Sequence, residues 1–290
     1  EGHFDYVGDS KADKCLWREA REGWTVGYRP GAAPNARPDA GNVTRLGEKG
    51  PGLLRTLAKA MRPHQWAKNA LVFVPALTSG MILDAGVLFT VALTAIFVSF
   101  VASSVYLMND LLDIDADRAH RTKWRRPLAH GDLSIPAGIA LSAVLAAAGL
   151  GGAWLLGGPW LAAWLAVYMM VSTAYSLRLK SMMVGDAVVL AALYTIRIWI
   201  GAIAIGVALS FWLLLFSVFL FLSLAYLKRY IEMRDAIDPK RLLSGRGYVG
   251  GDLDVVMASG VSAGMVSILV LALFARDAGA TGHYARPEVL

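Results

Sequence analysis

The segment Asn109-Asp110-Leu-Leu-Asp113-Ile-Asp115-Ala-Asp117 follows a long apolar run at residues 86–108 and precedes a strongly basic segment. On a helix, residues three and seven positions apart return to nearly the same angle. Asp110, Asp113 and Asp117 are therefore predicted to share one face, with Asp115 pointing away. Carboxylates this close repel one another, so the arrangement is favourable mainly around a hard cation. Mg²⁺ is the natural candidate because it accepts a few carboxylate oxygens and keeps positions for water and phosphate. The alternative is a solvated acidic helix end.

The composition is that of a polytopic membrane protein. Of the 290 residues, 56% are hydrophobic and 17% charged, and the mean hydropathy is +0.50, outside the balance of soluble globular proteins. A membrane span needs about 20 apolar residues at helical rise. A short stretch at 69–83 and six longer ones predict seven spans in an all-α bundle. The longer stretches are 86–108, 135–157, 159–177, 184–206, 209–227 and 255–275.

The positions of the charges predict how the chain sits in the membrane. The net charge of +6 would suit a nucleic-acid partner, but the Lys and Arg residues gather in loops between spans. These loops are 118–126, 178–180 and 228–246, whereas the turns at 157–159 and 206–210 carry no charge. By the positive-inside rule, the basic loops, the acidic segment and the N-terminus lie in the cytoplasm. We expect an integral protein of a prokaryotic plasma membrane whose active site faces the cytoplasm, with no nucleic-acid partner.

The first 27 residues resemble part of a different domain. Phe4–Val7 predicts a strand, and the following Gly8-Asp9-Ser10-Lys-Ala-Asp13 is similar to the last motif of haloacid-dehalogenase-type phosphatases. In that family Asp9 and Asp13 would bind Mg²⁺; the alternative is a strand followed by a capped helix. No nucleophilic Asp on an earlier strand is present, so a working phosphatase is excluded. We expect a C-terminal remnant of such a domain at 1–27, a Gly- and Pro-rich linker at 28–52, and a transmembrane domain at 53–290.

The two ends of the sequence indicate that it is part of a longer protein. It begins at Glu1 rather than Met, and it ends after Tyr284-Ala-Arg286-Pro287, which is similar to the approach to a further span. The single cysteine, Cys15, permits no internal disulfide. In the last predicted span, Gly260 and Gly264 are spaced for close helix packing.

Several polar side chains near the spans are candidates to bind a phosphorylated substrate. Lys68 would either bind phosphate at the membrane mouth or snorkel to the headgroups. Arg197 lies near the middle of a span, where a charge usually faces a polar cavity. The segment 245–250 fits Gly-x-Gly-x-x-Gly, but no strand precedes it, so a dinucleotide fold is excluded, while its amides can still wrap a phosphate. The candidate substrate-binding residues are Lys68, Asn109, Lys123, Arg126, Tyr175, Asp186, Arg197, Lys228, Arg229, Arg246 and Tyr248.

The motif Asn-Asp-x-x-Asp-x-x-x-Asp after the second span, followed by a basic stretch ending Arg126-Pro-Leu and then Gly131, resembles the UbiA superfamily of intramembrane prenyltransferases. The resemblance implies a bundle of about nine helices around a cavity open to the cytoplasm, seven of them in this sequence. It also implies that Asn109 and the catalytic carboxylates Asp110, Asp113 and Asp117 hold Mg²⁺ and a diphosphate.

The sequence departs from the common UbiA pattern at the second site. Many members carry a further Asp-rich motif after the sixth span, whereas here that loop has Lys228-Arg229-Tyr-x-Glu232 and Gly245-Arg246-Gly-Tyr248. Together with Arg62-Pro-x-Gln-Trp-x-Lys-Asn69, this is similar to the polyprenyl-phosphate phosphoribosyltransferase branch. The resemblance implies a polyprenyl phosphate and a phosphorylated small molecule, phosphoribosyl pyrophosphate, as substrates.

Two other functions stay open at this point. The first is prenyl transfer from a prenyl diphosphate to an aromatic or other small acceptor. The second is a cation transporter, which favours broken helices and charges at mid-membrane depth; here the acids cluster at one surface. The sequence does not indicate an oligomeric state.

Overall fold

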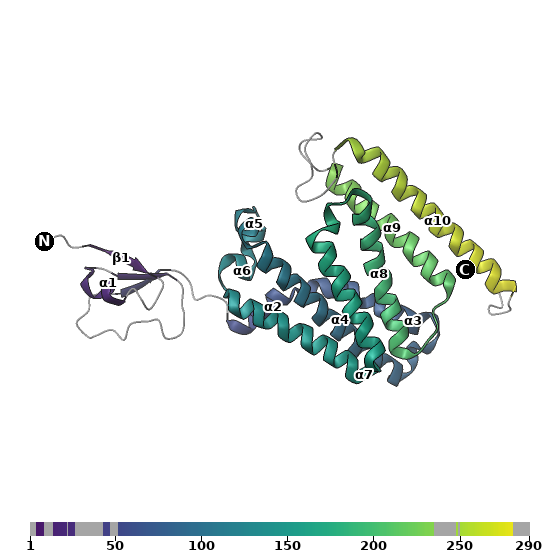
Figure 1. Ribbon diagram of the computed structural model, residues 1–290, viewed down its shortest axis with the longest axis horizontal. Coiled ribbons are helices and arrows are strands. Elements are labelled where there is room, and N and C mark those ends of the chain that lie inside the picture. Colours follow the sequence, from purple (N-terminus) through teal and green to yellow (C-terminus); the bar gives the residue numbers. More distant parts are fainter. Residues whose placement is uncertain are drawn as a thin grey trace.

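The computed structural model describes residues 4–8, 14–21, 23–26, 43–46, 52–234, 248 and 250–280. Its N-terminal part is a small parallel sheet and its larger part is all helical (Figure 1). The sheet has the order β1-β2-β3, with Tyr6 opposite Gly23 and Thr25 opposite Arg45. Its elements are β1 (Tyr6–Gly8), α1 (Lys14–Glu19), β2 (Gly23–Val26) and β3 (Val43–Leu46).

The sheet confirms one sequence prediction and corrects another. The strand predicted at 4–7 is present as β1. The predicted linker 28–52 is not all linker, because Val43–Leu46 forms β3 and pairs with β2; the β-branched Val43 and Thr44 favour a strand. Asp9 and Asp13 lie outside the described residues, so the phosphatase-like remnant stays a prediction.

Five helices of the larger part are long and apolar enough to cross a membrane. They are α4 (Ala85–Leu112), α7 (Ile135–Leu177), α8 (Met183–Ile205), α9 (Phe211–Arg234) and α10 (Leu253–Ala280). Shorter elements connect and flank them, with η denoting a 3₁₀ helix. These are α2 (Leu53–Met61), η2 (Pro63–Phe73), α3 (Val74–Thr78), η3 (Met81–Leu83), α5 (Ile114–Ala119), η4 (Lys123–Arg125), α6 (Pro127–His130), η5 (Leu179–Ser181) and η6 (Gly250–Asp252).

Helix α7 contains two of the predicted spans. Its 43 residues would measure about 65 Å if straight, twice the thickness of a bilayer core. Gly157 and Gly158 leave the helical conformation, and Gly158 has φ 71°, so the helix bends into two limbs. Six of the seven predicted spans are thus present as long helices or limbs.

The seventh predicted span, 69–83, is wrong as a single helix. The structure has η2, then α3, then a turn at Gly80 with φ 72°, then η3. Pro75 near the start of α3 lacks the amide hydrogen that would continue the preceding turns. Each piece alone is too short to cross a bilayer.

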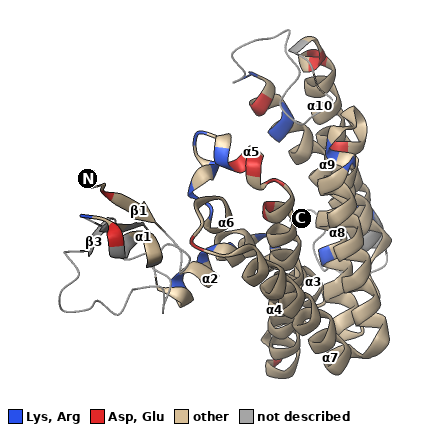
Figure 2. Ribbon diagram, turned by 60° about the vertical axis from the view of Figure 1, so that its left-hand side comes forward, with Lys and Arg blue, Asp and Glu red and all other residues tan. Residues whose placement is uncertain are grey.

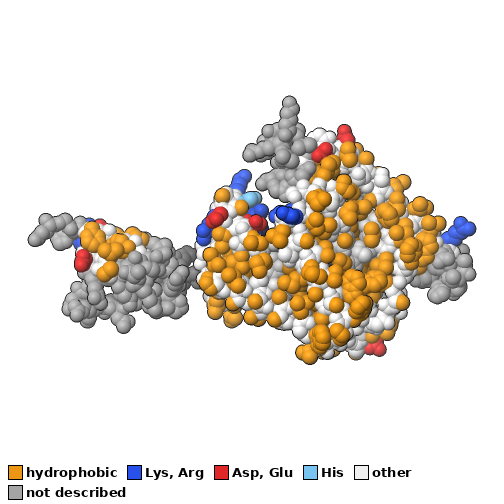
Figure 3. All heavy atoms as spheres, viewed as in Figure 1, with side chains coloured by type: hydrophobic (Ala, Val, Ile, Leu, Met, Phe, Trp, Pro, Cys, Tyr) orange, Lys and Arg blue, Asp and Glu red, His pale blue; other side chains and the backbone are white. Residues whose placement is uncertain are grey.

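The helices bring the charged loops to one end of the bundle. Figure 2 shows Lys, Arg, Asp and Glu gathered mainly around α5 and α6 and at the ends of α9 and α10. Figure 3 shows hydrophobic side chains spread over the long helices between the two ends. The acidic segment, the basic loops 118–126 and 178–180 and the described residues 228–234 therefore share one end, while the uncharged turns at 157–159 and 206–210 lie at the other.

Small residues let the helices approach closely. A Cβ on Gly201 of α8 would lie 2.1 Å from the carbonyl oxygen of Val72, so η2 runs directly against α8. Gly260 and Gly264 of α10 face α9, where a Cβ on either would lie 3.1 Å from Tyr226 or Ser223. The Ser223 hydroxyl also donates to the Gly260 carbonyl at 2.8 Å. The predicted packing role of the two glycines is confirmed.

Candidate functional site

The acidic segment lies at a joint between two helices. Helix α4 ends at Leu112, Asp113 leaves the helical conformation (φ −99°, ψ 15°), and α5 begins at Ile114. Asp110 and Asp117 are buried, whereas Asp113 and Asp115 are exposed. Two of the three carboxylates predicted to share a face therefore meet, and the third lies at the solvent-exposed joint.

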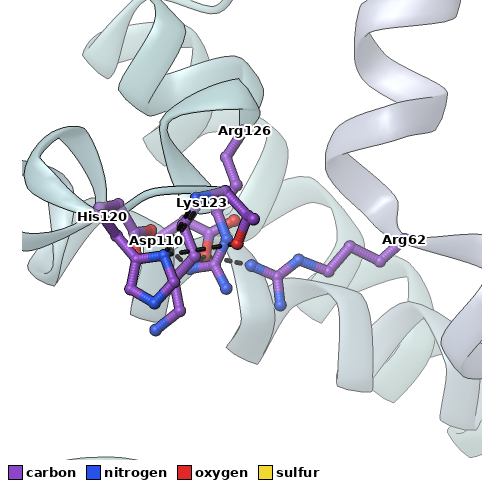
Figure 4. Close-up of polar contacts among 7 residues, drawn as sticks. Arg62, Asp110, His120, Lys123 and Arg126 are labelled. Carbon is purple, nitrogen blue, oxygen red and sulfur yellow. Dashed lines mark hydrogen bonds and ion pairs between the residues drawn. The ribbon is translucent and has the colours of Figure 1, made fainter. Parts of the chain in front are cut away.

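Two arginines converge on the buried carboxylates (Figure 4). One nitrogen of Arg126, Nη1, donates to Asp110 Oδ1 at 3.0 Å and also to Asp117 Oδ2. Arg62 donates from Nη2 to the same Oδ1 of Asp110. Arg62 ends α2 in a left-handed conformation (φ 54°), which turns the chain into η2. Arg62 begins the motif Arg62-Pro-x-Gln-Trp-x-Lys-Asn69 but was not predicted to be a site residue. Its position directly before Pro63 was the feature of the sequence that could have indicated a role for it.

A basic pocket opens beside Asp110. Its volume is about 360 Å³, and its wall includes His64, Gln65 and Thr122 from two separate segments of the chain. Figure 4 shows Lys123 and His120 beside Asp110 and Arg126, with Arg62 reaching in from the opposite side. The cationic side chains that line the pocket are Lys59, Arg62, Lys123, Arg125 and Arg126. Several guanidinium and ammonium groups around one cavity suit an anion with many oxygens.

The carboxylates fit a magnesium ion only in part. Among the described residues, no three His, Cys, Asp or Glu side chains form a group that could hold a metal, and Asp113, the third predicted ligand, is exposed at the joint between α4 and α5. Asp110 and Asp117, however, both accept from the same nitrogen of Arg126, so their oxygens converge on one point. Carboxylate oxygens are hard ligands of the kind that Mg²⁺ prefers. This pair fits the ion, and the role of Asp113 stays a prediction.

A second cluster of charges, which contains three of the predicted binding residues, is closed to solvent. Asp186 of α8 and Arg229 of α9 have no exposed side-chain surface, and Arg229 Nε lies 2.6 Å from Asp186 Oδ2. Arg229 also pairs with Glu232, and the Tyr175 hydroxyl donates to Asp186 at 2.7 Å. These residues tie α7, α8 and α9 together. The ion pair of Asp186 and Arg229 forms inside the bundle, and their role in substrate binding stays a prediction.

The remaining candidates at this end of the bundle are placed as follows. Asn109 donates to the Ser176 hydroxyl at 2.8 Å and so joins α4 to the end of α7. Tyr248 is buried against Tyr226 and Met233 of α9. Arg246 lies outside the described residues.

A second cavity, of about 440 Å³, lies between η2, α8 and α9. Lys68 of η2 and Lys228 of α9 both line it, and the rest of its wall is apolar or aromatic. Lys68 is half-buried. Burial lowers the pKa of the Lys68 ammonium, and the positive charges of Lys228 and Arg197 lower it further.

Arg197 lies behind the wall of this cavity rather than on it. Its side chain is buried, and it donates to Asn69 Oδ1 at 2.9 Å, to the Leu193 carbonyl and to the Tyr168 hydroxyl at 2.7 Å. Its guanidinium carbon is 5.4 Å from the ring centroid of Tyr194, which lines the cavity. Neither Tyr168 nor Asn69 was predicted as a hydrogen-bond partner of Arg197, because the sequence does not indicate which hydroxyl or amide within an apolar span lies near a given arginine.

Comparison with known proteins gives several relatives. The sequence is 35% identical over 289 residues to the uncharacterized protein y4nM of Sinorhizobium fredii, covering 99% of this chain and 56% of that protein. It is 40% identical to the nodulation protein NoeC of Azorhizobium caulinodans, over 76% of this chain and 71% of NoeC. It is 38% identical to the decaprenyl-phosphate phosphoribosyltransferase of Mycobacterium tuberculosis, over 62% of this chain and 61% of that enzyme. The chain thus spans little more than half the length of the first of these relatives.

Solved structures show the same fold. A UbiA homologue from Archaeoglobus fulgidus bound to GPP and Mg²⁺ matches with a TM-score of 0.62 and 17% identity, over 76% of this chain and 77% of that one. Its complex with DMAPP and Mg²⁺ matches with a TM-score of 0.64. The profile of the UbiA prenyltransferase family matches residues 72–242, more than half of the sequence. The chain therefore belongs to the UbiA prenyltransferase family.

Proposed function

We propose that this protein is a Mg²⁺-dependent intramembrane transferase that moves a phosphoribosyl group from phosphoribosyl pyrophosphate to a polyprenyl phosphate. The observation that carries the proposal is the basic pocket beside Asp110, where this carboxylate lies among five cationic side chains and shares Arg126 with the buried carboxylate of Asp117. The relatives named decaprenyl-phosphate phosphoribosyltransferase support this choice of donor and acceptor.

The pocket matches the needs of a diphosphate donor. Guanidinium groups of Arg62 and Arg126 and the ammonium of Lys123 would bind the diphosphate oxygens, since forked donors match phosphate geometry. Asp110 and Asp117, with Asp113 at the exposed edge, would hold Mg²⁺. When bound, the ion neutralises the negative charge that grows on the departing diphosphate.

The chemistry follows from this arrangement. The bond between the ribosyl carbon and the diphosphate oxygen breaks, and its electron pair leaves with pyrophosphate. An oxygen of the lipid phosphate forms the new bond to that carbon. Cationic side chains that hold the leaving oxygens stabilise the transition state, where the diphosphate charge is greatest.

Placement in the cell follows from the charge pattern. We propose that the basic end of the bundle faces the cytoplasm of the plasma membrane, where the positive-inside rule puts it and where a soluble phosphorylated donor is available. We further propose that residues 53–290 form the transferase domain and that the first 27 residues are the remnant of a phosphatase-like domain.

A second candidate reaction is prenyl transfer from a prenyl diphosphate to an aromatic or other small acceptor. Structures of the Archaeoglobus homologue contain GPP or DMAPP with Mg²⁺, and the same pocket could hold their diphosphate. A cation transporter is disfavoured because the carboxylates cluster at one end and the deep charge, Arg197, is hydrogen bonded inside the bundle.

The test follows pyrophosphate release by the purified protein in detergent with Mg²⁺ and phosphoribosyl pyrophosphate. We expect release only when a polyprenyl phosphate is added, and a rate that is roughly 10²–10³-fold lower from the Asp110→Asn variant under the same conditions. Lipid-independent release, or none with active controls, would contradict the proposal. Release from geranyl diphosphate with an aromatic acceptor would then favour the second reaction.

A further inference from the structure

We propose that Ser103 of α4 is a positioning residue whose hydroxyl holds the turn around Arg62 and so keeps the Arg62 guanidinium beside Asp110. The inference rests on the proposed function, because that function assigns Arg62 to the diphosphate. Ser103 is buried and is not among the described residues that line the basic pocket. It would therefore act through Arg62 and not on the substrate.

The backbone at Arg62 has an unfavourable conformation. Arg62 has φ 54° and ψ 58°, and it is the one non-glycine residue with a positive φ in the described part of the chain. In this left-handed region the Cβ crowds the following carbonyl oxygen, so a side chain stays there only where surrounding contacts hold it. Helix α2 ends at this turn and η2 begins directly after it. A looser turn would let Arg62 move away from Asp110, which it reaches across the pocket (Figure 4).

The Ser103 hydroxyl bonds to the chain on both sides of Arg62. It donates to the Met61 carbonyl at 2.7 Å and accepts from Trp66 Nε1 at 3.0 Å. The Met61 carbonyl belongs to the last turn of α2, where the helix itself supplies no further amide to bond it. A hydroxyl can donate to one partner while it accepts from another. Alanine at this position would remove both contacts at once.

One stripe of α4 faces this turn. Its four members are spaced three, three and four positions apart, which places them along one side of a helix. They are Phe100, Ser103, Tyr106 and Asp110. The ring of Phe100 packs edge-on against Trp66, with 6.3 Å between the centroids. The guanidinium carbon of Arg62 lies 5.5 Å from the ring centroid of Tyr106. The stripe thus holds both ends of the arginine, and Ser103 is the member that bonds to the backbone beside it.

A fixed turn matters for binding because it reduces the entropy that a ligand must overcome. A guanidinium that is already in place loses little freedom when a diphosphate binds, whereas a loose one must be ordered at that moment. Loss of the Ser103 contacts should therefore weaken diphosphate binding although Arg62 keeps its charge.

Binding of inorganic pyrophosphate with Mg²⁺ to the purified protein in detergent tests the inference. We expect Ser103→Ala to raise the Kd for pyrophosphate by about ten-fold. Ser103→Thr, which keeps the hydroxyl, should restore most of the affinity. Arg62→Met should also weaken binding. Adding Ser103→Ala to Arg62→Met should then have no further effect, because the serine acts through the arginine.

The matched control is Ser104→Ala. Ser104 is the next residue of α4, it is also buried, and its hydroxyl bonds to that of Ser142 at 3.1 Å. Its removal reports the general cost of losing a buried hydroxyl from this helix, and it should leave pyrophosphate binding unchanged.

Three results would overturn the inference. They are an equal loss of binding in the Ser104 variant, a full additional loss when Ser103→Ala is added to Arg62→Met, and a wild type without affinity for pyrophosphate. If Ser103→Ala does not fold, Trp66→Phe removes the indole N–H and keeps an aromatic ring against Phe100; its smaller loss should again vanish in the Arg62→Met background. Because the probe is inorganic pyrophosphate, failure of phosphoribosyl transfer would refute the proposed reaction without changing this result.

Discussion

Two clusters at the same end of the bundle each join one arginine to two carboxylates. Arg126 binds Asp110 and Asp117, and Arg229 binds Asp186 and Glu232. The side chain of Arg126 is 27% exposed and lines a pocket, whereas that of Arg229 is 0% exposed. The two clusters thus contain the same chemical groups and differ in their access to solvent.

The difference has a physical basis. The cluster of Arg126, Asp110 and Asp117 is called the open cluster, and that of Arg229, Asp186 and Glu232 the closed cluster. In the open cluster, water or a phosphate can replace a carboxylate as the partner of Arg126. In the closed cluster, any loss of a partner leaves a buried charge, which costs far more than an exposed one. The closed cluster holds α8 and α9 in register, and Lys228, next to Arg229, lines the cavity between η2, α8 and α9.

The largest expected effect tests the open cluster. Asp110→Asn keeps the size of the side chain but removes the negative charge that would hold Mg²⁺. We expect pyrophosphate release to fall by roughly 10²–10³-fold, as for the loss of a main electrostatic contact. Asp115→Asn is the matched control, because the Asp115 side chain is 95% exposed and should leave the rate unchanged. A near-normal rate for Asp110→Asn would rule out the proposed site.

Removing a charge from the closed cluster should lower the stability of the protein. Asp186→Ala leaves Arg229 buried with one carboxylate fewer, and we expect the free energy of unfolding to fall by about 3–5 kcal/mol. The double variant Asp186→Leu/Arg229→Met removes both charges and should recover most of that loss. Thermal unfolding in detergent measures both. A single variant as stable as wild type would show that the pair does not hold the helices.

A smaller effect is expected for Asp113, which lies at the exposed joint between α4 and α5. Asp113→Asn should raise the Mg²⁺ concentration that gives half-maximal activity by about ten-fold, if Asp113 completes the metal site from its edge. The maximal rate at saturating Mg²⁺ should change little. An unchanged Mg²⁺ requirement would limit the ligands to the two buried carboxylates.

The smallest effect concerns pH. We propose that Lys68 binds a substrate phosphate, which it can do only when protonated, so binding of a phosphorylated lipid should weaken as the pH rises through the pKa of Lys68. Burial, Lys228 and Arg197 all lower that pKa, so the loss should begin at a lower pH than for a solvated lysine. The KM for the lipid should rise several-fold over this range. Lys68→Arg stays charged and should give a flat profile; an identical profile in both proteins would contradict the role of Lys68.

Much of the fold could be predicted from hydrophobicity, because a bilayer imposes long apolar helices whatever their packing. The prediction of a single helix over 69–83 was wrong because Pro75 and Gly80 break this stretch into short helices. Hydrophobic composition alone does not reveal such breaks. The strand β3 (Val43–Leu46) was missed because four residues inside a Gly- and Pro-rich region carry little signal. The candidate site was predicted where charge density is high, at Asp110, Asp117, Lys123 and Arg126.

The sequence by itself determined the membrane class, the family resemblance, the clustering of charge at one end and the carboxylates and cations from which the proposed Mg²⁺ and phosphate site is built. Only the tertiary structure decided which of those charges are available. It closed Asp186 and Arg229 against each other, put Arg197 behind Tyr194 and brought Arg62 to Asp110. The physical reason is that charge and hydrophobicity are properties of single residues, whereas burial and pairing depend on contacts between helices far apart in the chain.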